Sequence, residues 1–148
     1  MRYACYPCPF GILQIGYENE NVVSISRVDT CRGNESSAVS DLANAQLQEY
    51  FLGKRQRFDF PIQPQGTPFQ LSVWNELRRI PYGETRTYGQ IAVSIGKPGG
   101  SRAVGMACNR NPLWIAIPCH RVVGSNGALT GYAGGLDIKR ALLALEQS

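Results

Sequence analysis

The sequence predicts an α+β protein, in which a small N-terminal α/β lobe precedes a helical C-terminal domain with a helix-turn-helix. Three observations lead to this prediction. Residues 11–25 have the pattern of two strands around a polar turn, residues 39–51 carry apolar side chains at helical spacing, and the chain after residue 67 contains short helices with capping residues at their starts. A chain of 148 residues is long enough for one domain, or for two small lobes that share a core.

The N-terminal lobe, residues 1–65, is expected to be structural. Gly11–Tyr17 and Val22–Ile25 flank a polar turn, which is the pattern of a β-hairpin. Apolar residues then recur at helical spacing as far as Phe51, and Gly53 is expected to end this helix.

Two further segments are expected to be extended. Residues 57–62 alternate between polar and apolar side chains, which predicts a short edge strand that ends at a proline. The stretch 61–68, rich in Pro, Gln and Gly, is expected to be a linker. Leu113–Ile117 is a continuous apolar run and predicts a buried strand, which Pro118 halts.

The C-terminal domain, residues 66–148, is expected to be helical. Its first two helices begin with the capping boxes Thr67-Pro68-Phe69-Gln70 and Thr87-Tyr88-Gly89-Gln90. Ser101 is expected to cap a third helix that runs to about Cys108. A glycine-rich turn joins the second and third helices and predicts a helix-turn-helix, although such helix pairs are also common in proteins that do not bind DNA.

The charge of the chain is unevenly distributed. The formal net charge is +4, but residues 1–65 hold six basic and seven acidic side chains, whereas residues 66–148 hold nine basic and four acidic ones. A basic half indicates a polyanionic partner. No apolar stretch approaches the ~20 residues of a membrane span, and the N-terminus has no signal or transit pattern. We therefore expect a cytoplasmic protein, nuclear in a eukaryote, with no membrane contact.

The chain contains five cysteines and a single histidine. Without a secretory signal, free thiols are the expectation. Cys5-x-x-Cys8 has the spacing of half a zinc site, but no second pair follows, and the motif precedes the first expected strand instead of opening a helix. We therefore expect no bound metal and no cofactor.

The sharpest chemical signal is the sequence Pro118-Cys119-His120-Arg121, placed where a buried strand ends. A reactive cysteine needs a nearby base or cation, and His120 is the candidate base. Adjacent residues of an extended chain point to opposite faces, so the two side chains require a turn or a bridging water to cooperate. The alternative is a buried structural cysteine beside a hydrogen-bonded histidine. Glu146 on the last helix is the expected acid behind His120.

Several blocks of the C-terminal domain match one known family in order and spacing. They are Gly83-Glu84-Thr85-Arg86-Thr87-Tyr88, Ser101-Arg102-Ala103-Val104-Gly105, Asn111-Pro112-x5-Pro118-Cys119-His120-Arg121-Val122-Val123, Gly131-Tyr132-Ala133-Gly134-Gly135-Leu136, and the helix through Lys139 and Glu146. With these blocks the chain resembles the O6-alkylguanine-DNA alkyltransferases. The resemblance is dense from about residue 67 to residue 146 and looser before it.

The resemblance implies DNA repair by direct damage reversal, in a reaction that uses each protein molecule once. Cys119 would take the alkyl group from O6-alkylguanine. His120 would deprotonate the Cys119 thiol through a water, while Glu146 orients the imidazole. Tyr88 would donate toward the departing guanine and crowd the 3′ phosphate. Asn111 would be the hinge between the recognition helix and the active-site segment.

The same resemblance implies how the substrate is held. The partner would be double-stranded DNA, bound in the minor groove, with Arg102 filling the gap left by the flipped nucleotide and the small residues Ala103 and Gly105 allowing close approach. The pocket for the flipped base would be formed by Val122, Tyr132, Ala133 and Lys139. We expect the protein to act as a monomer.

Some residues depart from the family pattern. Met106 stands where many relatives have Gly or Ala, and Cys108 adds an unexpected thiol on the same helix. Ala133 replaces a serine found in some members. Two alternatives remain open at this point: a module that binds alkylated DNA without repairing it, and an unrelated thiol enzyme that acts on a small substrate.

Overall fold

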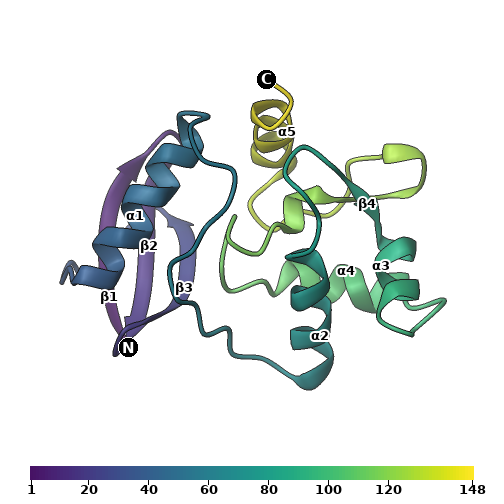
Figure 1. Ribbon diagram of the computed structural model, residues 1–148, viewed down its shortest axis with the longest axis horizontal. Coiled ribbons are helices and arrows are strands. Elements are labelled where there is room, and N and C mark those ends of the chain that lie inside the picture. The colour runs from purple at the N-terminus through teal and green to yellow at the C-terminus, as the bar shows by residue number, and fades with distance from the viewer. The chain divides into compact units, whose positions relative to one another are not determined.

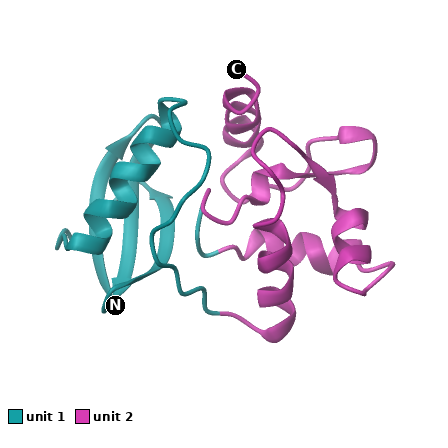
Figure 2. Ribbon diagram, in the orientation of Figure 1, with its two compact units in different colours: residues 1–65, 112–114 teal, residues 66–111, 115–148 magenta.

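The computed structural model describes residues 1–148 and divides the chain into two compact units (Figure 2). Unit 1 comprises Met1–Gln65 together with Pro112–Trp114. Unit 2 comprises Gly66–Asn111 and Ile115–Ser148. The short segment 112–114 therefore follows the helical part in sequence but belongs to unit 1.

A three-stranded antiparallel sheet forms one side of unit 1 (Figure 1). Its strands follow each other in sequence order: β1 (Arg2–Cys8), β2 (Gly11–Glu18) and β3 (Asn21–Val28). The hairpin expected between β2 and β3 is present. The expectation that Cys5-x-x-Cys8 precedes the first strand is wrong, since both cysteines lie on β1. Pro7 weakens the strand signal of this segment, and an edge strand is the place in a sheet that tolerates it.

Helix α1 (Ala38–Phe51) covers the sheet, as the spacing of its apolar residues predicts. Ser37 and Ser40 form a capping box at its start. Gly53 follows its end with a φ of +75°, which a residue without Cβ adopts freely. The core between helix and sheet consists of side chains from both, among them Leu13, Ile15, Ile25, Ala43, Leu47 and Tyr50.

Two expected strands do not form. In the segment 57–62 only Ile62 makes a bridge, pairing with Val22, because the aromatic side chains there pack against Tyr50 and one another instead of extending the sheet. The segment 113–117 is also not a strand. Leu113 bridges Ile25, but Ile115 has a φ of +71°, so the chain turns after Trp114.

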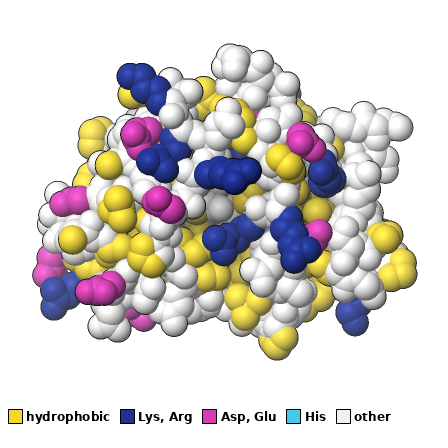
Figure 3. All heavy atoms as spheres, in the orientation of Figure 1, with side chains coloured by type: hydrophobic (Ala, Val, Ile, Leu, Met, Phe, Trp, Pro, Cys, Tyr) yellow, Lys and Arg dark blue, Asp and Glu magenta, His cyan; other side chains and the backbone are white.

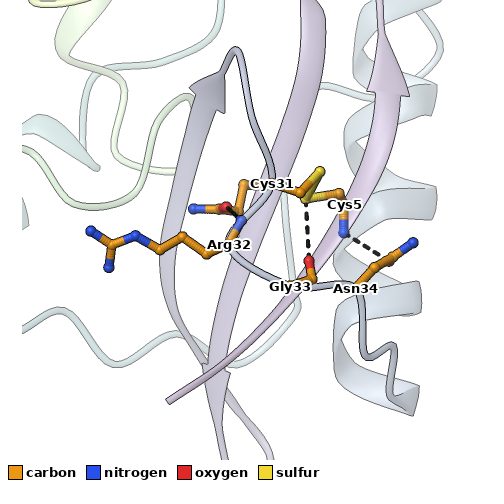
Figure 4. The surroundings of a disulfide bond; sticks show 6 residues. Cys5, Cys31, Arg32, Gly33 and Asn34 are labelled. Atoms are coloured by element: carbon orange, nitrogen blue, oxygen red, sulfur yellow. Dashed lines mark hydrogen bonds between the residues drawn. A yellow bond between two sulfur atoms is a disulfide. The ribbon is translucent and has the colours of Figure 1, made fainter.

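A disulfide joins Cys5 on β1 to Cys31 in the loop that follows β3 (Figure 4). Asn34 from the same loop accepts a hydrogen bond from the backbone N–H of Cys5 at 3.2 Å, so the loop is held against β1 at more than one point. The expectation that all cysteines are free is therefore wrong for this pair. Cys8, Cys108 and Cys119 are free thiols.

Unit 2 contains the capped helices that the sequence predicts (Figure 1). Thr67 and Gln70 form the capping box of α2 (Pro68–Leu77), and Thr87 and Gln90 form that of α3 (Tyr88–Ser94). Helix α4 (Ser101–Asn109) begins one residue earlier than expected. Gly100 is its N-cap and Ser101 makes no capping bond, because the tight turn before α4 needs glycine: a Cβ on Gly100 would lie 2.9 Å from the carbonyl oxygen of Lys97.

These three helices pack on one another and hold α3 and α4 as a pair joined by the turn at 95–100. Trp74 of α2 is buried, and its Nε1 donates a hydrogen bond to the carbonyl oxygen of Ala107 in α4 at 2.9 Å. Val104 and Ile91 are buried in the same core. The helix pair therefore packs on a buried core that includes Trp74 of α2.

The rest of unit 2 surrounds the Pro-Cys-His-Arg motif. The 3-10 turn η1 (Cys119–Arg121) leads into β5 (Val122–Val123), which pairs in parallel with β4 (Arg86–Thr87). A second 3-10 turn, η2 (Ser125–Gly127), and a loop precede α5 (Leu136–Leu145), which packs on η1. Glu146 directly follows α5 as its C-cap.

The surface charge follows the division seen in the sequence. On the face shown in Figure 3, acidic side chains gather over unit 1, whereas the charged side chains over unit 2 are mostly Lys and Arg. None of the helices has the length and apolar character that crossing a membrane requires.

The disulfide gives a stability prediction. Cys5 and Cys31 are 26 residues apart, and closing a loop of this length is expected to stabilise the fold by about 3 kcal/mol. Replacement Cys31→Ser should therefore lower the free energy of unfolding in urea by about that amount under non-reducing conditions. In dithiothreitol the variant and the unchanged protein should unfold alike. Cys8→Ser is the matched control, and an effect of Cys31→Ser no larger than this control would contradict the prediction.

Candidate active site

The Pro-Cys-His-Arg motif forms a buried turn instead of an extended segment. The N–H of Cys119 donates to the carbonyl oxygen of Ile117 at 2.8 Å, and that of Arg121 donates to Pro118 at 3.0 Å. Cys119, His120 and Arg121 are all buried. The turn removes the constraint that adjacent side chains of a strand point to opposite faces.

The Cys119 thiol is held by Asn111. The Asn111 side-chain amide Nδ2 lies 3.2 Å from Sγ of Cys119 and 2.8 Å from the carbonyl oxygen of Ile117. Burial raises the pKa of the Cys119 thiol, whereas the hydrogen bond from Asn111 and the positive charge of Lys139 lower it. The buried thiol therefore needs a base before it can act as a nucleophile.

His120 is fully buried and is paired with Glu146. Its Nε2 lies 2.6 Å from Oε2 of Glu146, and because a carboxylate only accepts, we assign the ring proton to Nε2. The other ring nitrogen, Nδ1, is buried and has no hydrogen-bond partner in the structure. Burial lowers the pKa of His120, although the hydrogen bond and charge of Glu146 raise it in part. The lowered pKa and the unpartnered Nδ1 together favour a neutral imidazole with a free lone pair at Nδ1, and we assign the ring this state.

Arg121 belongs to the same network, and sequence reasoning gave it no role. Its Nε and Nη2 donate to the two oxygens of Glu146 at 2.8 Å and 3.0 Å. In the sequence, Arg121 is only one residue of the Pro-Cys-His-Arg motif, and nothing there assigns it a function. Counted with the other basic residues it looked like a surface charge, and no local pattern shows that a helix end 25 residues later supplies its partner.

Lys139 on α5 is the other buried cation of this region. Its Nζ donates to the carbonyl oxygens of Val122 at 2.6 Å and Thr130 at 3.1 Å, and it lies 5.8 Å and 5.9 Å from the ring centres of Tyr88 and Tyr132. Burial lowers the pKa of Lys139. The lysine therefore ties the loop before α5 to β5 and brings a positive charge toward the thiol.

Tyr88 and Cys108 border this cluster from α3 and α4. The Tyr88 hydroxyl donates to the carbonyl oxygen of Thr130 at 3.1 Å, and burial raises its pKa. Burial raises the pKa of Cys108 to about 12. At neutral pH the Cys108 thiol is therefore protonated and a poor nucleophile.

The structure separates the remaining expected residues into two groups. Arg102 and Ala103 are exposed on α4, Gly105 is half-buried, and Met106 points outward with 71% of its surface exposed. These residues belong to the outer side of the helix pair and not to the thiol cluster. On the other side Val122 is buried, Tyr132 is half-buried and hydrogen-bonds Cys119, and Ala133 is exposed. No group of three or more His, Cys, Asp and Glu side chains is arranged to hold a metal ion.

A buried cysteine, a neutral imidazole with one free nitrogen and a carboxylate behind it make up the machinery of a protein that uses a thiolate as its nucleophile. The comparisons with known proteins name the family. Residues 68–148 match the family described as 6-O-methylguanine DNA methyltransferase, DNA binding domain. The chain belongs to this family.

Individual relatives agree with this assignment. A methylated-DNA–protein-cysteine methyltransferase of Methanosarcina acetivorans is 49% identical over 158 residues, which cover 100% of this chain and 99% of the relative. The structure of Mycobacterium tuberculosis OGT in complex with DNA matches with a TM-score of 0.92 at 42% identity, over 98% of this chain and 92% of that one. S. pombe Atl1 in complex with DNA containing O6-carboxymethylguanine matches with a TM-score of 0.50 at 32% identity, over 55% and 78%.

The Asn111 contacts give a prediction for stability. Asn111→Ala removes the hydrogen bonds to the thiol and to the Ile117 carbonyl, which keeps its bond from the Cys119 N–H, and losing such a hydrogen bond costs about 0.5–1.5 kcal/mol. Urea denaturation should show a loss of this size. Asn109→Ala, an exposed change at the end of α4, is the matched control and should have little effect. Equal stability of the two variants would contradict the role given to Asn111.

Proposed function

We propose that this protein repairs DNA by transferring the alkyl group of an O6-alkylguanine to Cys119, in a reaction that consumes one protein molecule per lesion. The observation that supports this most strongly is the chain of buried groups from Cys119 through His120 to Glu146. The free Nδ1 of His120 is the one basic atom there without a partner, and it is the atom that a proton acceptor must offer.

In the proposed reaction the Cys119 proton passes to Nδ1 of His120 through a bridging water. The thiolate sulfur then attacks the alkyl carbon, so that an S–C bond forms while the C–O bond breaks and its electron pair stays on the guanine oxygen. The guanine takes up a proton in return, for which Tyr88 is the proposed donor. To do this, the Tyr88 hydroxyl exchanges its hydrogen bond to Thr130 for one to the base. Solvent then reprotonates Tyr88 and accepts the proton held by His120, so that the net proton transfer is from the thiol to the guanine. The thioether is stable, so the protein does not turn over.

The proposed substrate is double-stranded DNA, bound through α3 and α4. Unit 2 carries the excess of basic residues, and the structures that resemble it include complexes with DNA. Arg102 at the exposed start of α4 is the proposed residue that fills the base stack, with Ala103 and Gly105 next to the minor groove. The reacting atom lies inside the duplex, so the nucleotide must be flipped out at a cost of a few kcal/mol.

The proposed pocket for the flipped base lies between β5 and the loop before α5. Tyr132 would be its wall, and backbone groups of Cys119, Val122 and Ala133 would bind the guanine edge. The carbonyl of Val122 already accepts a hydrogen bond from Lys139, which fixes its direction. The residues of this proposed pocket all belong to unit 2, and unit 1 is proposed to be a scaffold.

The second candidate is a protein that binds the lesion without repairing it. The likeness to Atl1 bound to damaged DNA favours keeping this candidate. It differs from the first in one outcome, because the cysteine would stay unmodified. A small-substrate thiol enzyme would show turnover and no response to DNA.

The test is the mass of the protein after incubation with a duplex that contains one O6-methylguanine. The expected product carries one methyl group in place of the thiol hydrogen, located on the peptide with Cys119, and the reaction stops when protein and lesion are used up one to one. Cys119→Ser should bind the duplex and remain unmodified, while Cys8→Ser should react normally. Methylation of another residue, or tight binding without methylation, would reject the proposal.

A further inference from the structure

We propose that Arg121 is a positioning residue for this reaction: its guanidinium fixes the Glu146 carboxylate against His120 and keeps the imidazole free to take the thiol proton. The inference rests on the proposed function, since it assigns the residue that sets the state of the base. The side chain of Arg121 bonds to Glu146 and to the carbonyl oxygen of Ile80, so the proposed role is exerted through Glu146.

The contact between Arg121 and Glu146 is bidentate. Nε of Arg121 lies 2.8 Å from Oε1, and Nη2 lies 3.0 Å from Oε2. This paired geometry matches the fork of a guanidinium to the plane of a carboxylate, which a lysine cannot reproduce. Oε2 also receives Nε2 of His120 at 2.6 Å. The guanidinium therefore sets the plane in which the carboxylate meets the imidazole.

Arg121 is itself held from the other side. Its Nη1 donates to the carbonyl oxygen of Ile80 at 2.8 Å, and its guanidinium lies 5.7 Å from the ring centre of Tyr82. The next residue in this turn, Gly83, donates its N–H to Oε1 of Glu146 at 3.2 Å. The turn after α2 thus anchors the arginine and the carboxylate together, and neither can rotate without breaking a buried hydrogen bond.

The charges around His120 explain why the arginine matters for proton transfer. From α5 and its end come Lys139 and Glu146, and from the η1 turn come Arg121 and the Cys119 thiol. The charged residue of α2, Glu76, pairs with Arg79 at 4.0 Å. Burial is the main reason that the pKa of His120 is lowered, and the charges of Arg121 and Lys139 act in the same direction against Glu146.

Loss of the Arg121 charge leaves a buried carboxylate facing the imidazole with less compensation. The pKa of His120 should then rise, because the negative charge favours the imidazolium. An imidazolium has no free lone pair at Nδ1 and cannot accept the thiol proton. At low pH the transfer rate falls because His120 becomes protonated, and this part of the rate–pH profile is its acid limb. The acid limb should therefore move to higher pH when the Arg121 charge is lost.

A purely structural role is the competing explanation. A buried arginine that joins the η1 turn to the end of α5 also stabilises the fold, and removing it would lower stability and slow the reaction. Such an effect would scale the rate by the same factor at every pH. The position of the acid limb separates the two explanations.

The experiment measures the single-turnover rate of methyl transfer against pH for Arg121→Gln and Arg121→Lys, under conditions in which circular dichroism shows the variants folded. With Arg121→Gln we expect the acid limb to move up by about one pH unit, which is about a tenfold slower transfer at a pH on that limb. Arg121→Lys keeps the charge but loses the fork, so its limb should stay near that of the unchanged protein while its rate falls. Arg140→Gln, an exposed arginine on α5, is the matched control. A lower rate with an unmoved limb in Arg121→Gln would overturn the proposal.

A second readout does not need DNA. The chain has one histidine, so the proton NMR signal of its ring reports the pKa of His120 directly. This pKa should be higher in Arg121→Gln than in Arg140→Gln, and an equal value in the two would also overturn the proposal. If Arg121→Gln does not fold, the His120 pKa is compared between Arg121→Lys, which keeps the charge, and Arg121→Met, which loses it. A higher pKa in Arg121→Met supports the proposal, and an equal pKa in the two variants overturns it. Failure of the unchanged protein to transfer methyl would instead reject the proposed function and leave the titration valid.

Discussion

The carboxylate of Glu146 lies inside unit 2, where an uncompensated negative charge would cost several kcal/mol. Four donors surround it: Nε2 of His120, Nε and Nη2 of Arg121, and the backbone N–H of Gly83. Each oxygen receives two of them. The favourable contacts are strong enough to keep the charge in the interior, and in doing so they determine the orientation of the imidazole and hence which of its nitrogens is free.

This requirement constrains distant parts of the chain. The turn after α2 must bring a backbone N–H to the carboxylate, and Gly83 does so with a φ of +81°, at a place where a Cβ would lie 3.2 Å from the backbone oxygen of Glu146. Gln147 donates back to the carbonyl oxygen of Gly83 at 2.7 Å. Hydrogen bonds therefore join the end of α5 to this turn. Arg121 of the Pro-Cys-His-Arg turn bonds to both of them, through Glu146 and the carbonyl oxygen of Ile80.

Much of unit 2 follows from local sequence signals. The capping boxes at Thr67 and Thr87 predict the starts of α2 and α3 correctly, because the groups that satisfy the helix end lie within four residues. The Cys-His sequence and the acid at Glu146 are also found from the sequence, since the chemistry of a thiol nucleophile demands a base and an acid. The roles of the individual residues stay predictions.

The sequence fails where the deciding contact is distant. Nothing near Cys5 or Cys31 indicates that they pair, and Pro7 conceals an edge strand. Ile115 belongs to an apolar run that resembles a strand, but its backbone turns there. The buried cation Arg121 looks like a surface charge, and only the family resemblance gives Lys139 a place near the pocket, because only the folded chain shows which carbonyls and carboxylates surround them. Burial of a charge is a property of the tertiary structure, and local periodicity does not contain it.

The protonation state of the His120 ring tests most directly whether His120 is the base that activates Cys119. Nitrogen-15 NMR of protein labelled in its one histidine distinguishes a protonated from a bare ring nitrogen. At neutral pH we expect a neutral ring with the proton on Nε2, facing Glu146, and a bare Nδ1. A ring protonated on both nitrogens, or one with its proton on Nδ1, would contradict the assignment of His120 as the base that activates Cys119.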